Sequence, residues 1–134
     1  MKKLGKVLLA GGVACAATLW VGAESAFAIP QFKKQFDAMY VDEDSDDPAK
    51  QALAEAAKEA KCDICHMGRN KKMRNPYGEQ LSELLDKKED KNNKEKIDEA
   101  LETVAEIKVD PDDENSPTYG QLLDEGKLPV VVEE

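Results

Sequence analysis

The sequence predicts an all-α domain of about four to five short helices. Apolar residues recur at three- and four-residue intervals in several separate segments, which is the spacing of one helix face. Asp-Pro and Ser-Pro pairs precede two of these segments, and such pairs are typical helix starts. Residues 130–132 could form a short strand, but one such run cannot make a sheet.

The first two predicted helices lie between residues 32 and 64. The first has an apolar face formed by Phe32, Phe36, Met39 and Tyr40. Residues 41–47 hold five carboxylates and no apolar stripe, which predicts a solvated connector, and they lack the central Gly and the closing Glu of a calcium loop. Asp47 and Pro48 then favour a helix start. The apolar face of the second helix is predicted to consist of Leu53, Ala56, Ala57, Ala60 and Ile64.

The remaining predicted helices follow a turn at residues 75–78. One begins soon after this turn and another near Asn93, with a charged joint between them. Their apolar faces are formed by Leu81, Leu84 and Leu85 in the first, and by Ile97, Ala100, Leu101, Val104 and Ile107 in the second. After an acidic loop, Ser116 and Pro117 are predicted to start a final short helix that Gly126 ends.

Cys62, Cys65 and His66 form a C-x-x-C-H motif that contains the only histidine of the chain. This pattern is typical of covalent haem attachment. Two thiols add across the vinyl groups of a haem, and the adjacent imidazole binds the iron from one face. Two intervening residues on one helical turn would place both sulfurs at neighbouring corners of the porphyrin. We therefore expect one haem c, bound by Cys62, Cys65 and His66, with His66 as the metal ligand.

Two other uses of paired cysteines fit the sequence less well. A structural zinc site needs about four Cys or His ligands. The chain has three cysteines and one histidine, and Cys15 lies in a segment that we expect to be removed. A thioredoxin-like redox pair normally lies in a βαβ unit. The flanks of this motif are instead rich in Ala, Lys and Glu and contain no strand-like run. Both alternatives, and a chance occurrence of the motif, stay open at the level of sequence.

The amino-terminal segment has the layout of a secretory signal peptide. Three lysines at positions 2, 3 and 6 precede an uncharged stretch over residues 7–23, and Ala-Phe-Ala at 26–28 is a small-x-small cleavage signal. Residues 1–28 are therefore predicted to be the signal peptide and residues 29–134 a monohaem domain, periplasmic or secreted. A retained membrane anchor is the alternative, because about 17 uncharged residues are borderline for a span. Lipid attachment at Cys15 is a further alternative.

The chain is acidic, with a net charge of −9. Removal of the predicted signal peptide takes away three lysines and one glutamate, which changes the net charge from −9 to −11. This balance argues against nucleic-acid binding and against docking on an anionic lipid surface, and we expect no stable membrane insertion of the mature chain. The mature chain would keep two cysteines, both in the motif, so no disulfide framework is expected.

The chain resembles monohaem c-type cytochromes in Cys62, Cys65 and His66, in its export signal and in its helical setting. The resemblance implies that the cysteines form thioether links, that His66 is the proximal iron ligand, and that the helices wrap around the haem. Residues 74–78, 117–120 and 126–129 are similar to segments of small exported bacterial monohaem proteins. This narrower likeness spans most of the mature chain.

The sequence leaves the second axial ligand of the iron open. Small cytochromes c take a methionine far downstream of the motif, but no methionine follows Met73 in this chain. Met73 lies seven residues after His66, a stretch that spans roughly 23 to 25 Å when extended. Met39 lies upstream on an apolar face, and Met67 adjoins the proximal histidine, where it points poorly for this role. A lysine, a water molecule or an open position are the other possibilities.

The expected function is a periplasmic single-electron carrier and not an enzyme, because the sequence shows no second histidine and no nucleophile and base pair. A haem-based sensor of small ligands or redox state with an open distal site is one alternative, and a haem subunit of a larger dehydrogenase is another. Four cations beside the motif are predicted to dock a redox protein partner, or else to form a solvated loop that balances the haem propionates: Arg69, Lys71, Lys72 and Arg74.

Overall fold

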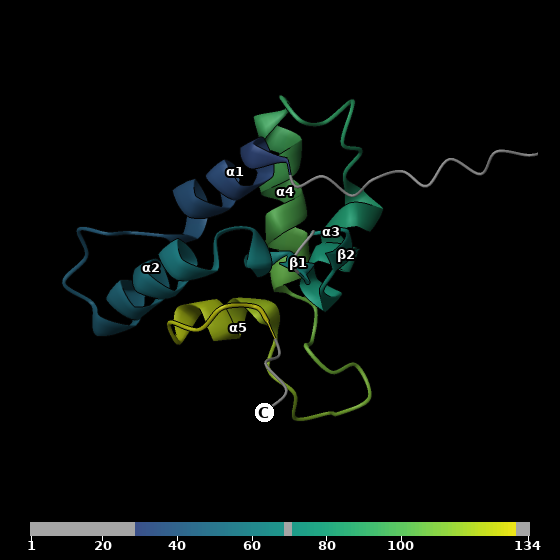
Figure 1. Ribbon diagram of the computed structural model, residues 1–134. Helices are drawn as coiled ribbons and strands as arrows, with labels where there is room; N and C mark the ends of the chain where they lie inside the picture. Colours follow the sequence, from purple (N-terminus) through teal and green to yellow (C-terminus); the bar gives the residue numbers. More distant parts are fainter. Residues whose placement is uncertain (1–28, 69–70, 131–134) are drawn as a thin grey trace, which may run out of the picture.

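The computed structural model describes residues 29–68 and 71–130 (Figure 1). The predicted signal peptide, residues 131–134 and Arg69 lie outside this part of the chain. Within it the chain forms five α-helices, one short 3₁₀ helix and a two-stranded antiparallel hairpin, which confirms the prediction of a mostly helical fold. None of these helices combines the length and the apolar character that a bilayer span requires.

Both helices predicted between residues 32 and 64 are present, and the second begins where the sequence predicts. Helix α1 is Pro30–Tyr40 and helix α2 is Pro48–Ala60, and each has a proline in its first turn. The Asp47 carboxylate accepts a hydrogen bond from the Ala49 N–H at 2.8 Å and so caps α2. The acidic connector between the two helices is mostly exposed, as expected of a solvated loop.

Helix α2 ends before the haem motif, where the sequence predicts a continuous helix. Lys61 has a φ of 51°, which takes the chain out of the α-helical path, and the 3₁₀ helix η1 (Lys61–Ile64) follows. Strands β1 (His66–Met67) and β2 (Met73–Arg74) then form a hairpin that the sequence did not predict. Strands of two residues are too short to show the alternation by which a strand is recognised.

Three further helices complete the fold: α3 (Pro76–Leu84), α4 (Lys94–Ala105) and α5 (Tyr119–Asp124). Helix α4 begins near Asn93, as predicted, and Asn93 caps it by accepting a hydrogen bond from the Lys96 N–H at 3.2 Å. Gly126 has a φ of 79° and follows the end of α5, which confirms its predicted role.

The predicted start of the last helix at Ser116 and Pro117 is wrong. Thr118 is the cap, and its side chain and that of Gln121 bond reciprocally to each other's backbone N–H groups. This capping box satisfies two free amide groups, which a start at Ser116 would not do.

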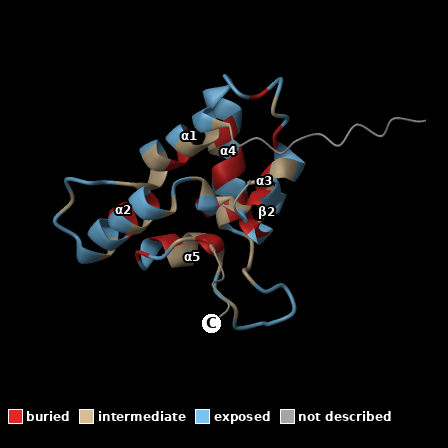
Figure 2. Ribbon diagram, in the orientation of Figure 1, coloured by how far each residue is buried: buried red, intermediate tan, exposed pale blue. Residues whose placement is uncertain are grey.

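Helix α4 is the centre of the core and contacts α1, α3 and α5 (Figure 1). Its buried face, red in Figure 2, consists of Ile97, Ala100, Leu101 and Val104. Four of the five residues predicted for this stripe are therefore in the core. Full burial of a Leu, Ile, Val or Phe side chain contributes about 1.5 to 3 kcal/mol, so α4 accounts for much of the apolar stabilisation.

Candidate functional site

The C-x-x-C-H motif lies on a tight turn that one buried residue anchors in the core. Cys62 and Ile64 belong to η1, and the Cys65 N–H donates to the Cys62 carbonyl at 3.3 Å. Ile64 is completely buried, whereas Cys62, Cys65 and His66 are partly exposed. The turn therefore places the two thiols and the imidazole in the lining of a cavity while Ile64 fixes its position.

Asn75 connects this turn to helix α3. Its side-chain Nδ2 donates to the carbonyls of Asp63 at 3.1 Å and Ile64 at 2.8 Å, and its Oδ1 accepts from the Gly78 N–H at 2.8 Å. The backbone N–H of Asn75 also donates to the Cys65 carbonyl at 3.0 Å. One residue, only 4% exposed, thus caps α3 and holds the carbonyls of the motif. The sequence indicated a turn here, but not these bonds.

Gly78 lets α3 approach the motif closely. A Cβ atom at this position would lie 2.0 Å from the Cys65 carbonyl oxygen and 2.9 Å from its carbon. No real Cβ makes such contacts, so any side chain here would push α3 and the motif apart. A glycine at the third position of a helix carries no signal of this kind in the sequence alone.

The hairpin after the motif separates its side chains onto two faces. His66 pairs with Arg74 and Met67 pairs with Met73. Successive side chains of a strand point to opposite faces. His66 and Arg74 accordingly line a cavity, whereas Met67 and Met73 are exposed.

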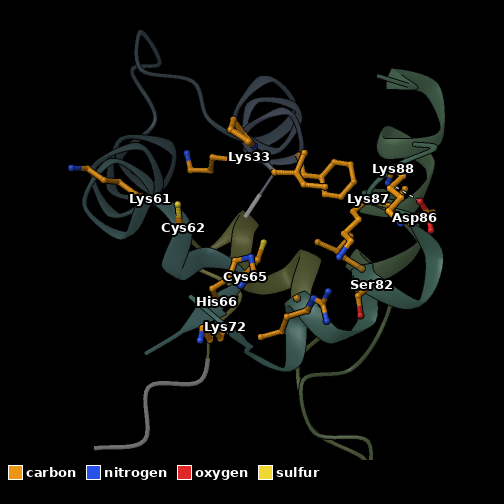
Figure 3. Close-up of a pocket in the computed structure, with 17 residues that line it drawn as sticks. Lys33, Lys61, Cys62, Cys65, His66, Lys72, Ser82, Asp86, Lys87 and Lys88 are labelled. Carbon is orange, nitrogen blue, oxygen red and sulfur yellow. Dashed lines mark hydrogen bonds between the residues drawn. The ribbon is translucent and has the colours of Figure 1, made fainter. Parts of the chain in front are cut away.

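The cavity has a volume of about 670 Å³, within the range that cofactor sites occupy. Cys62, Cys65 and His66 lie along one side of it in Figure 3, with Lys87 across from them. Apolar side chains from α1, α3 and the residue after α3 form much of the rest: Phe32, Leu81 and Leu85. The cavity thus joins a thiol and imidazole wall to an apolar interior.

Among the residues that the structure describes, the charged side chains of the lining are cationic with the exception of Asp86. The cations come from four separate segments of the chain: Lys33, Lys61, Lys72 with Arg74, and Lys87 with Lys88. This concentration is unusual in a chain with a net charge of −9. A ligand that combines an apolar body with anionic groups would suit both parts of the lining.

Burial sets the protonation state of the motif. It raises the pKa of the Cys65 thiol to about 12, with a smaller contribution in the same direction from Cys62. It also lowers the pKa of His66, against the effect of backbone hydrogen bonds at Met73 and Lys71. At neutral pH the site therefore presents the Cys65 thiol and a neutral imidazole, and the His66 Nδ1 is buried without a hydrogen-bond partner in the described part of the chain.

The structure brings together most of the predicted site residues. Cys62, Cys65 and His66 share the cavity wall, and Lys72 and Arg74 line the same cavity. Lys71 is ion-paired with Asp63 outside the lining. The sequence did not identify Lys33, Lys61, Lys87 and Lys88 as part of the site, because only the fold brings these segments together.

A zinc site finds no support in the described residues. No three Cys, His, Asp or Glu side chains converge there as metal ligands. Cys62 and Cys65 are free thiols.

No protein-family model, curated protein or solved structure matches this chain. The function therefore has to be argued from the chemistry of the cavity.

Proposed function

We propose that this protein is an exported monohaem c-type cytochrome that carries single electrons between redox proteins. The observation that carries the proposal is the cavity wall on which two thiols and one imidazole meet an apolar interior. A haem needs these three groups for covalent attachment and axial ligation, and an apolar site for its ring. Its iron would supply the one-electron chemistry by alternating between the ferric and ferrous states.

Each group of the cavity has a defined role in this proposal. Cys62 and Cys65 form the thioether links, and His66, neutral and with one buried nitrogen unpaired, binds the iron. Phe32, Leu81 and Leu85 exclude water from the ring. The lysines and Arg74 offset the negative charge of the propionates and attract an acidic redox partner.

Haem attachment is tested on the full chain after expression in a host that matures c-type cytochromes. The purified product should be heavier than the processed polypeptide by the mass of one haem, and it should undergo reversible reduction. Cys62→Ser and Cys65→Ser should each leave one thioether, and the double variant should carry no covalent haem. Cys15→Ser is the matched control and should keep the full haem content. A bare polypeptide mass with two free thiols would disprove the proposal.

A further inference from the structure

We infer that the haem iron has no methionine or second histidine as its other axial ligand, and that this position binds a small exogenous ligand such as cyanide or carbon monoxide. The inference rests on the proposed function, since it concerns a haem bound by Cys62, Cys65 and His66. The chain has one histidine, which is His66, and four methionines. One of these is Met1, in the predicted signal peptide, so three methionines need to be considered.

The hairpin keeps two of these methionines away from the cavity. Met67 and Met73 face each other across the strand pair, next to the pair of His66 and Arg74. Because His66 and Arg74 line the cavity, the alternation of the strands places both methionines on the other face, where they are 42% and 59% exposed. The pairing also holds Met73 beside the strand of the proximal histidine, so Met73 does not reach the far side of a haem bound by His66.

The third methionine lies at the wrong end of helix α1. The α1 residues that line the cavity are Pro30, Phe32 and Lys33, all in its first turn or just after it. Met39 comes six residues after Lys33, which is about 9 Å further along the helix axis. Its side chain packs against the hydrophobic core. Met39 therefore serves the core and does not reach the cavity.

Lysine is the remaining type of nitrogen ligand in the lining. The Lys33 ammonium is paired with both carboxylate oxygens of Asp37, one turn further along α1. An ammonium group carries three hydrogens and no lone pair to give to a metal. Lys61, Lys72 and Lys88 are exposed to solvent, whereas Lys87 is half-buried and lies across the cavity from the motif (Figure 3). The apolar side chains of the lining offer no ligand, so Lys87 is the described lysine that would compete with a small molecule for the position, and its substitution below tests this.

Such a position would make electron transfer sensitive to ligands. A ligand that binds the oxidised iron more tightly would lower the reduction potential, and one that binds the reduced iron more tightly would raise it. The cations of the lining further favour anionic ligands.

The test begins with the haem-loaded full chain. Intact mass first shows whether haem is attached, so a failure of the proposed function is seen before any ligand is added. Carbon monoxide is then added to the reduced protein and cyanide to the oxidised protein, and the visible absorption spectrum is followed. We expect a saturable change with one ligand per haem for both probes. If neither probe changes the spectrum of the haem-loaded protein, the inference is wrong while haem attachment stands.

Substitutions identify any protein ligand. Met39→Leu, Met67→Leu and Met73→Leu conserve volume and should leave the ferric spectrum unchanged, with the cyanide Kd within about twofold of the parent. A changed spectrum in any one of them would identify a methionine ligand and overturn the inference. Lys33→Ala and Lys87→Ala should also leave the spectrum unchanged, with Lys34→Ala as the exposed control on α1. Cyanide binding that tightens about tenfold or more in either, but not in the control, would show that lysine occupies the position.

Discussion

Asn75 illustrates how much of the site depends on a single side chain. Its amide nitrogen satisfies two carbonyls of the motif, and its oxygen caps α3. A buried carbonyl without a partner costs about 1 to 3 kcal/mol, and loss of a cap costs about 0.5 to 2 kcal/mol.

Substitution of Asn75 by alanine should therefore destabilise the fold by about 2 to 4 kcal/mol, as measured by urea unfolding, because both roles are lost. Asn75→Asp keeps the oxygen that caps α3 and should recover only part of the loss. Asn93→Ala is the matched control, because Asn93 caps α4 in an exposed position and makes no contact with the motif. It should cost about 0.5 to 2 kcal/mol. Equal losses for Asn75→Ala and Asn93→Ala would contradict the role of Asn75 in the motif.

Gly78 and Gly120 form a natural pair for a second test, since each follows a tyrosine at the start of a helix. A Cβ at Gly78 would lie 2.0 Å from a backbone oxygen of Cys65, whereas at Gly120 the nearest atom would be 3.0 Å away. Gly78→Ala should reduce the free energy of unfolding by about 1 to 3 kcal/mol or more, through forced separation of α3 from the motif. Gly120→Ala should cost clearly less. Thermal unfolding of both variants measures the difference, and similar losses would argue against a close contact at Gly78.

At this scale the sequence pointed to the three residues of the motif but not to the contacts that hold them in place. Cys62, Cys65 and His66 follow from spacing alone, because haem attachment requires those residue types at those intervals. The roles of Asn75 and Gly78 depend on contacts across 11 residues or more and on a distance between two backbones. Such contacts leave no periodic pattern in the sequence.

Among the elements, α4 should be the most sensitive to truncation. Leu101 is 2% exposed on its inner face, whereas Leu84, at the end of α3, is 40% exposed. Leu101→Ala should destabilise the protein by about 2 to 5 kcal/mol, because it leaves a cavity among three helices. Leu84→Ala removes the same atoms at the surface and should change stability by no more than about 0.5 kcal/mol. Chemical denaturation of both variants provides the comparison, and a large loss for Leu84→Ala would show that α3 is packed differently.

The hydrogen bonds of Asp90, in the joint between α3 and α4, predict that the stability of the fold depends on pH. Asp90 accepts hydrogen bonds from Lys96 Nζ and the Asp86 N–H, both at 2.7 Å, and these lower the pKa of Asp90. Because the folded-state pKa lies below the unfolded value of about 3.9, the carboxylate stabilises the fold above that pH and loses its effect as the pH falls through the folded value.

The stability difference between the parent and Asp90→Asn should thus be larger at pH 7 than at about pH 3, where the carboxylate is increasingly protonated. Urea unfolding at the two pH values measures it. Asp46→Asn, at an exposed position of the acidic connector, is the control and should show little difference at either pH. If the stability difference between the parent and Asp90→Asn were the same at both pH values, the charge of Asp90 would make no contribution to stability.

The helices themselves were largely predictable, and their ends less so. The stripe from Ile97 to Val104, the cap at Asp47 and the start of a helix near Asn93 are local signals, and the structure agrees with all of them. The start of α5 was misplaced because a capping box at Thr118 outweighed the Ser-Pro signal two residues earlier. The break at Lys61 was not predicted, since nothing in its sequence neighbourhood favours a positive φ.

For the molecule as a whole, the main feature is the separation of charge. The chain is acidic, but the lining of its main cavity is cationic. Sequence could show only the cluster from Arg69 to Arg74; the contributions of α1, η1 and the joint after α3 depend on the folded arrangement.

This separation predicts how fast small anions reduce the proposed haem. Lys72→Glu reverses a charge in the cavity lining and should slow reduction by ascorbate at low ionic strength. Lys50→Glu makes the same change in net charge on an exposed position of α2 outside the lining, and should have a smaller effect. Stopped-flow absorbance gives both rates, and the difference should shrink at high salt. Equal rates for the two variants would mean that the local field of the cavity does not steer reductants.

The bonds of Asn75 also bear on how the chain would acquire its shape after the proposed export. The bond from Asn75 to Ile64 spans only 11 residues, and the entropy lost in closing so short a loop is small. The segment from η1 to the start of α3 can therefore take its final form early in folding, before distant helices have docked. An attachment enzyme would then meet both sulfhydryls already arranged on a defined turn, even while the rest of the polypeptide is still emerging into the compartment.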